Sequence, residues 1–362
     1  MPNFKKDYSS FQKGLGRLRT AMNGIPDRVP VFVQMHEFAM QELRVNAKEF
    51  FTHPDLLVGG YLSVLERYAI DVPTLDYDVY NIEAEAIGQT VIFSEYDMPD
   101  VDRSDPLIKS QDDLKKISTP DFASDGRLAM VVEINNLFCE LVGEAPTLNF
   151  CAPFTLAANI RGIEQLIMDI LLQPDFAGAL FDRIVEKLLA PWILYLKKKF
   201  PEAKGICGND ATSSLPIINM DILRDWIAPY ILRLRQICGP EIYVPNWVGE
   251  SQLKNPEEMF ELKMQVCPNF LEGQDPDVAE IGPAVYKDYA GKKGVPLILG
   301  VGAGFLALST PDEISARVKH YIEVGGKNGR FCLYLCNVGA TTPAENIKAA
   351  VGAVHAYGSY GR

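Results

Sequence analysis

Reactive and polar side chains follow most of the expected β-strands of this chain, at the point where each strand ends. The clearest case is the apolar run 331–335, typical of a buried parallel strand, which leads directly into Cys336 and Asn337. Across the chain, the strand-end candidates are His36, Glu37, Asp76, Asp78, Cys151, Cys207, Asp210, Asn246, Glu250, Glu272, Asp275, Asp277 and Cys336. Side chains of these types can bind a metal, transfer a proton or hydrogen-bond a substrate.

The elements that would position these residues are eight strands that alternate with helices. We expect the strands at 29–36, 71–79, 147–154, 204–210, 242–249, 270–275, 295–302 and from 331. Such alternation predicts parallel strands with right-handed crossovers, and eight units favour a closed (β/α)8 TIM barrel over an open sheet. The glycine-rich run 300–304 lacks the spacing of a dinucleotide-binding loop. A barrel would gather the strand-end candidates at one face.

The whole chain, residues 1–362, is expected to form one domain of the α/β class. A helix at 11–22 precedes the first strand as an N-terminal extension. An Asp-, Pro- and Ser-rich stretch at 89–124, with a short strand at 90–93, reads as an insertion after strand two. Helix starts are predicted at Thr310 and Thr342, because each is followed by proline and, three residues on, by glutamate.

Composition narrows the class of partner. The net charge of −12 argues against nucleic acid and against an anionic membrane surface, since both require a basic face. No apolar run is long enough to span a bilayer. The seven cysteines are odd in number, and the first residues lack the apolar stretch of a signal peptide. We therefore expect free thiols and a cytoplasmic location.

The strand-end thiols, imidazole and carboxylates could together hold zinc, but no local spacing defines such a site. Cys332 and Cys336 share a strand face yet stand about 13 Å apart at ~3.3 Å per residue, so only Cys336 is expected near the rim. A buried structural thiol is the alternative interpretation of Cys336. Trp247, at a strand end, is expected in a pocket wall.

Four stretches resemble the uroporphyrinogen decarboxylase superfamily, which includes cobalamin-dependent methyltransferases. They are 28–31, 83–88, 152–157 and 342–347, and their order along the chain is preserved. The resemblance covers almost the whole chain. It implies a (β/α)8 barrel, in agreement with the strand count.

Two branches of the superfamily fit poorly at the positions that matter for chemistry. The decarboxylase carries an Arg-Gln-Ala-Gly-Arg motif after its first strand, whereas the stretch 34–39 here has no arginine, and an acidic rim does not suit a polycarboxylate substrate. Thiol-directed methyltransferases bind zinc through His-x-Cys on strand five and a further cysteine on strand eight. Cys336 matches the last position, but Asn246 and Val248 replace the first two.

The chain is most similar to the first methyltransferase component of anaerobic O-demethylases, particularly at 246–251 and 272–277. This resemblance implies transfer of a methyl group from a small donor, a methoxylated aromatic above all, to the Co(I) of cobalamin on a partner corrinoid protein. Methylamines and methyl thioethers stay open as donors. The alternatives are a uroporphyrinogen decarboxylase-type decarboxylase and a non-catalytic substrate-binding barrel.

An ether oxygen is a poor leaving group, so a proton donor or a Lewis acid must assist it. Two solutions stay open: zinc held by Cys336 and Cys207 with some of the other candidates, or a carboxylic acid with a raised pKa. We expect a catalytic set, with Asn246 orienting the substrate, and a substrate-binding set. The catalytic set is His36, Asp210, Asn246 and Glu250, and the substrate-binding set is Asp78, Trp247 and Glu272.

Overall fold

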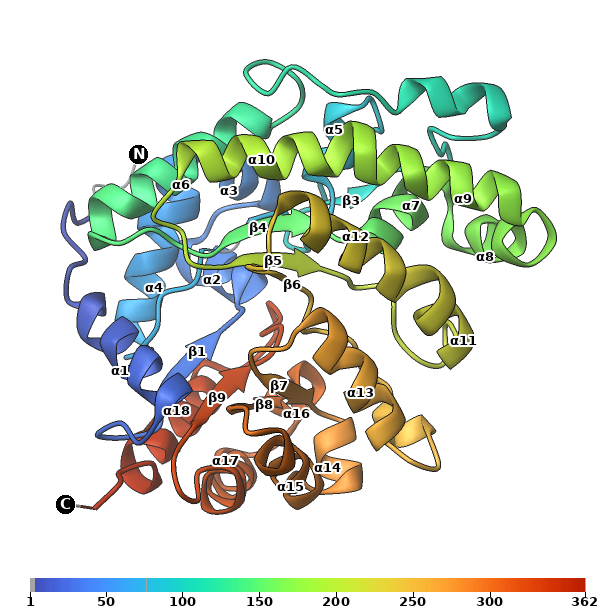
Figure 1. Cartoon of the computed structure of the whole chain (residues 1–362). Helices are drawn as coiled ribbons and strands as arrows, with labels where there is room; N and C mark the ends of the chain where they lie inside the picture. Colours follow the sequence, from blue (N-terminus) through green and yellow to red (C-terminus); the bar gives the residue numbers. More distant parts are fainter. Residues whose placement is uncertain (1–3, 76, 362) are drawn as a thin grey trace.

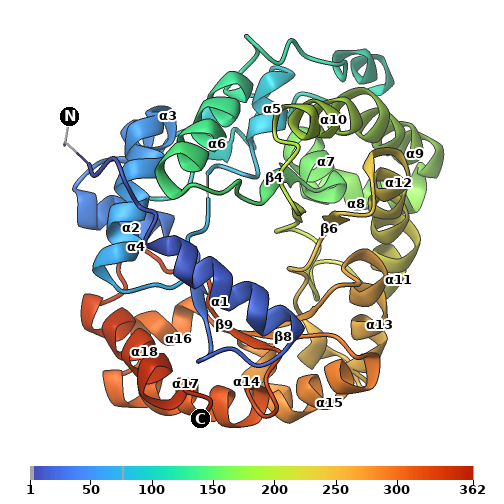
Figure 2. The same ribbon diagram turned by 60° about the vertical axis from the view of Figure 1, so that its left-hand side comes forward.

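The computed structural model describes residues 4–75 and 77–361, so the strand-end candidate Asp76 lies outside the described residues. Its parallel strands lie inside a ring of helices (Figures 1 and 2). They form two sheets, one with the order β1-β9-β8-β7 and the other with the order β4-β5-β6. The strands are β1 (Val31–Val33), β4 (Leu148–Cys151), β5 (Ile206–Asn209), β6 (Ile242–Tyr243), β7 (Leu271–Gln274), β8 (Leu297–Val301) and β9 (Phe331–Leu335).

Helices surround the two sheets (Figure 1). They are α1 (Phe11–Asn23), α2 (His36–Leu43), α3 (Ala47–Thr52), α4 (Tyr61–Arg67), α5 (Ile82–Ala86), α6 (Leu128–Val142), α7 (Pro153–Arg161), α8 (Ile163–Leu172), α9 (Pro174–Arg183), α10 (Ala190–Lys199), α11 (Met220–Ile222), α12 (Ala228–Cys238), α13 (Glu257–Val266), α14 (Asp277–Ile281), α15 (Pro283–Lys293), α16 (Ala303–Leu308), α17 (Pro311–Gly325) and α18 (Ala344–Tyr357). In the described part of the chain, none of these helices has the length and apolar character needed to cross a membrane.

Side chains alternate along each strand between an outer face, which packs against the helices, and an inner face, which carries polar groups toward the barrel interior. In β8, Leu297, Leu299 and Val301 are buried against the helices. Ile298 and, on β9, Tyr334 point inward to the barrel interior, because neighbouring parallel strands keep side chains in register. The apolar outer faces therefore build the core, and the inner positions are free to carry polar groups.

The expected strand two, at 71–79, is wrong as a regular strand among the residues described there. Pro73 removes a ladder donor, and the Asp71 carboxylate accepts hydrogen bonds from Arg17, Arg28 and the Val31 amide. The segment still runs between β1 and β4. The Thr74 hydroxyl donates to the Val33 carbonyl (3.0 Å), and the Tyr77 hydroxyl donates to the Asn149 carbonyl (2.8 Å).

The predicted N-terminal helix, the short strand in the insertion and one of the two predicted helix starts are found in the structure. The N-terminal helix and the short strand in the insertion are confirmed, the latter as β2 (Val91–Ile92), which pairs antiparallel with β3 (Asp100–Val101). The helix start at Thr310 is confirmed by a capping box with Glu313. The start at Thr342 is wrong, because Pro343 has an extended backbone and α18 begins only at Ala344.

Gly300 has a packing role on the inner face of β8. A Cβ at this position would stand 2.3 Å from Sγ of Cys336. We expect Gly300→Ala to lower the free energy of unfolding by about 1–3 kcal/mol through this overlap. Urea denaturation of Gly300→Ala, Cys336→Ala and the double variant measures it. If the loss is as large in the Cys336→Ala background, the overlap with the thiol is not its cause.

Candidate active site

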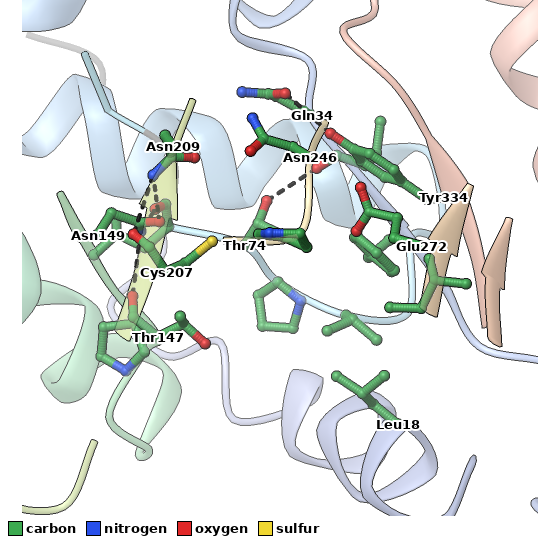
Figure 3. Close-up of a pocket in the computed structure, with 18 of the residues that line it drawn as sticks. Leu18, Gln34, Thr74, Thr147, Asn149, Cys207, Asn209, Asn246, Glu272 and Tyr334 are labelled. Carbon is green, nitrogen blue, oxygen red and sulfur yellow. Dashed lines mark hydrogen bonds between the residues drawn. The ribbon is translucent and has the colours of Figure 1, made fainter. Parts of the chain in front are cut away.

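A cavity of about 1000 Å³ occupies the interior of the barrel. Inward positions of both sheets line part of its wall and face each other across it (Figure 3), and α1 and the connecting loops supply most of the rest. At the carboxyl ends of the strands it reaches Asn246 and Asn337, and at the opposite end it reaches Leu18 and Met22 of α1. TIM-barrel interiors are normally filled by layers of side chains, so this hollow interior marks a binding site.

Neutral amides form a polar belt around the middle of the cavity. On β4 and β5, Nδ2 of Asn209 donates to Oδ1 of Asn149 (3.2 Å). Across the cavity, the Tyr334 hydroxyl donates to Oε1 of Gln34 (3.0 Å). Amides and hydroxyls fixed in this way can orient a neutral polar ligand without attracting a strongly charged one.

Glu272, on β7, is the carboxyl group of this belt. It is 7% exposed, lines the cavity, and accepts a hydrogen bond from Nε2 of Gln274 (2.7 Å). Burial raises the pKa of Glu272, although the Gln274 amide and the Lys263 ammonium act in the opposite direction. A carboxyl group held this way can stay protonated at higher pH than an exposed glutamate and can donate a proton into the cavity.

Positive charge on the described part of the wall is limited to Arg19 and Lys204, both on its exposed rim. Arg19 is neutralised by Glu144, 2.6 Å away. Glu202 adds negative charge to the same wall. The cavity is therefore poorly suited to a polyanionic ligand.

Asp210 and Trp247 lie directly behind Asn246 and not on the cavity wall. The fully buried Asp210 carboxylate accepts hydrogen bonds from Nε1 of Trp247 (2.9 Å) and the Thr155 hydroxyl (2.7 Å). The Asp210 amide donates to Oδ1 of Asn246 (3.3 Å). Burial raises the pKa of Asp210. These contacts hold the end of β5 and the Asn246 side chain in place, so Asp210 and Trp247 support the wall.

Glu250 also lies away from the cavity, in a buried charged cluster. Its carboxylate contacts Nζ of Lys263, which also donates to the Glu272 carbonyl (2.9 Å). Burial raises the pKa of Glu250 to about 7. Asp277 completes the cluster by accepting from the amides of Gly249 and Ser251. The cluster anchors the backbone that carries Glu272.

Asp78 is likewise structural. It is buried and ion-paired with Nη2 of Arg127 (2.5 Å), and Nδ2 of Asn81 donates to it (2.6 Å). Burial, opposed by Arg127, raises the pKa of Asp78 to about 6. The structure therefore separates Asp78 from the cavity wall that holds Glu272.

His36 lines a second, smaller cavity of about 220 Å³ together with Glu37 and Met98. Gln34 and Asn337 belong to both cavities, so the smaller one adjoins the carboxyl-end mouth of the larger. The His36 ring lies against Phe51 and Tyr61. Burial lowers the pKa of His36 to about 3, so its imidazole is neutral at ordinary pH.

This lowered pKa predicts a pH dependence of stability. The ordinary pKa of histidine is 6.5, so between pH 6.5 and about 3 the unfolded chain binds a proton that the folded chain does not. The His36 contribution therefore falls as pH falls through this window, by at most about 1.4 kcal/mol per pH unit. Urea denaturation at several pH values should show a shallower dependence for His36→Gln. The same change at exposed His320 should leave the wild-type slope, and equal slopes for all three would refute the assignment.

The comparisons with known proteins agree with this architecture. The family model described as uroporphyrinogen decarboxylase (URO-D) matches residues 16–357. This chain belongs to the uroporphyrinogen decarboxylase family. Among solved structures, a "methyltransferase from Methanosarcina mazei" is similar with a TM-score of 0.76 and 20% sequence identity, over 95% of this chain and 99% of that chain. No curated protein matches the chain. The expected (β/α)8 fold of the uroporphyrinogen decarboxylase family is thereby confirmed.

The thiols of this family member do not form a metal centre with the other described residues. Cys207 lines the cavity from β5, while Cys336 is buried beside Gly300 and outside the wall. Burial raises the pKa of Cys336, which favours the neutral thiol over the thiolate that binds metal. No group of three or more His, Cys, Asp or Glu residues in ranges 4–75 and 77–361 could hold an ion. The thiols and carboxylates of these ranges therefore do not fit zinc.

Of the predicted site residues, the structure places Asn246, Glu272 and Cys207 on one cavity wall. The cavity is also lined by Asn337, already noted at the end of its strand, and by residues that were not among the strand-end candidates: Gln34, Asn149, Asn209, Gln274 and Tyr334. Most of these lie two residues from another cavity-lining position. A polar residue at every second position of an apolar strand, as at 207 and 209 or 272 and 274, was the signal that could have found them.

Proposed function

We propose that this member of the uroporphyrinogen decarboxylase family transfers a methyl group from a methoxylated aromatic compound to the reduced cobalt of a corrinoid carried by a partner protein. The single observation that carries the proposal is Glu272, a buried carboxyl group with a raised pKa, in a cavity walled by amides and aromatic rings. The name of the similar structure, a methyltransferase, supports the same class of reaction.

The reaction places clear demands on the residues of this chain. The reduced cobalt of the partner's corrinoid would supply the electron pair that bonds the methyl carbon, and the carbon–oxygen bond would break with its pair left on oxygen. Glu272 supplies the proton that turns this oxygen into a neutral phenol, and a later solvent proton restores the acid. The aromatic wall holds the ring, and Asn246 and Gln34 orient the ether at the mouth.

Decarboxylation of a polycarboxylate fits the cavity less well. Such a substrate requires several cations, and Arg19, paired with Glu144, and Lys204 are those that the described wall supplies. Lys204 stands two residues from Glu202, whose negative charge on the same wall disfavours carboxylates. The charge of the wall therefore favours a neutral donor.

The test mixes the purified protein with chemically reduced cobalamin and a panel of methoxyarenes. We expect the cobalt absorption to change and a stoichiometric phenol to appear with at least one donor. Methylamines and methyl thioethers, run in parallel, separate the donor classes. An absence of turnover across all donors would leave a substrate-binding barrel and refute the proposal.

A further inference from the structure

We propose that the donor carries a second ring-sized apolar group, which binds in the α1 end of the cavity. We call this part the floor chamber, and its lining residues are Leu18, Met22, Phe32, Phe270, Ile298 and Tyr334. The inference rests on the proposed function, since it names the class of substrate for the same site. Under this inference, a methyl ether with one ring fills only part of the cavity.

The floor chamber is built from an apolar cluster that is separate from the main core. Ala21, Ile298 and Cys332 form its buried centre, and partly exposed side chains pack around them. Two ring pairs shape the chamber: Phe32 stacks on Tyr334 with centroids 4.6 Å apart, and Phe270 meets Tyr243 edge-on at 5.5 Å. Aromatic surfaces in these arrangements offer faces and edges on which a further ring can pack.

Helix α1 supplies an apolar face to this end of the cavity. Leu15, Leu18 and Met22 follow one another at spacings of three and four residues, so they lie on one side of the helix. All three line the cavity and keep part of their surface exposed. Because apolar surface left in water is unfavourable, this face favours an apolar occupant over solvent.

The volume of the cavity favours a donor with two rings over a donor with one. A cavity of roughly 150 Å³ is enough to hold benzene, whereas this cavity measures about 1000 Å³. Figure 3 shows Leu18 on the opposite side of the cavity from Gln34 and Asn246. A donor whose ether lies beside these amides therefore leaves the floor chamber unfilled unless it carries a second apolar group.

The experiment compares two ligands of matched polarity by calorimetry, without corrinoid: 4-methoxyphenol and 4-hydroxy-4′-methoxybiphenyl. We expect the two-ring ether to bind at least tenfold more tightly. Met22→Trp, which fills the floor chamber, should remove most of this preference by weakening the binding of the two-ring ether. Lys13→Trp places the same ring on the exposed side of α1 and should keep the wild-type preference.

Equal affinities of the two ligands for the wild-type protein would overturn the inference, and so would an unchanged preference in folded Met22→Trp. If Met22→Trp does not fold, Leu18→Phe takes its place and the wild-type comparison still decides. Failure of the proposed function looks different. If only the proposed function is wrong, the two-ring ether binds tightly but gives no methyl transfer. If only the floor-chamber inference is wrong, one-ring donors are demethylated and the two-ring ether binds no more tightly.

Discussion

Glu272→Gln is expected to lower the rate of methyl transfer by about 10²- to 10⁴-fold, because it removes the proton donor for the leaving oxygen. The amide keeps the size of the side chain and can still pair with Gln274, so binding of 4-methoxyphenol should change little. In the wild-type protein the rate should fall as pH rises through the raised pKa of Glu272, since the acid must be protonated to act. This limb of the pH profile should be absent in the variant.

The matched control is Glu202→Gln, an exposed carboxyl group on the same cavity wall. Its rate and pH profile should match those of the wild-type protein. If Glu272→Gln keeps its rate within a few-fold and shows the same high-pH limb, another group protonates the oxygen. A loss of rate together with a lowered melting temperature would instead identify Glu272 as structural.

Lys263→Met is expected to lower the free energy of unfolding by about 3–5 kcal/mol. The ammonium of Lys263 is 3% exposed and contacts the fully buried Glu250 carboxylate, so its removal leaves a buried charge without its partner. The pKa of Glu250 is already raised to about 7 by burial, and loss of Lys263 raises it further. The folded variant then binds a proton that the unfolded chain releases, so its stability should fall as pH rises from about 5 to about 8.

The double variant Lys263→Met with Glu250→Leu should recover much of this loss, since both buried charges are then absent. Urea denaturation at about pH 5 and about pH 8 compares these two variants with the wild-type protein. Because Lys263 also holds the Glu272 carbonyl, methyl transfer should stay reduced even where stability is recovered. A Lys263→Met variant as stable as the wild-type protein would show that the ion pair contributes nothing.

Much of the fold could be predicted from the sequence because its signals are local. Buried strands such as 297–301 and 331–335 read as apolar runs, and the capping box at Thr310 needs only four residues. Strand two was predicted wrongly because its hydrophobicity matches a strand, while its backbone is held by distant partners. Arg17 and Arg28 bind Asp71, and no pattern in the sequence around Asp71 predicts that contact.

The site was less predictable, since a strand-end carboxylate can turn toward the cavity or toward a buried cation. Glu272 faces the cavity, but Asp78 pairs with Arg127 and Glu250 with Lys263. Asp275 similarly pairs with Arg317. In each case the cation lies on another element. The pair therefore forms only when the elements pack together, and the local sequence around the carboxylate does not indicate it.

The two sheets of this barrel are not joined by a described backbone ladder at either seam, between β1 and β4 or between β6 and β7. In a fully paired barrel, strand number and stagger set the diameter. Here side chains such as Thr74 and Tyr77 bridge one seam. Relatives with other side chains at these positions could therefore enclose narrower or wider chambers on the same scaffold, without rebuilding either half.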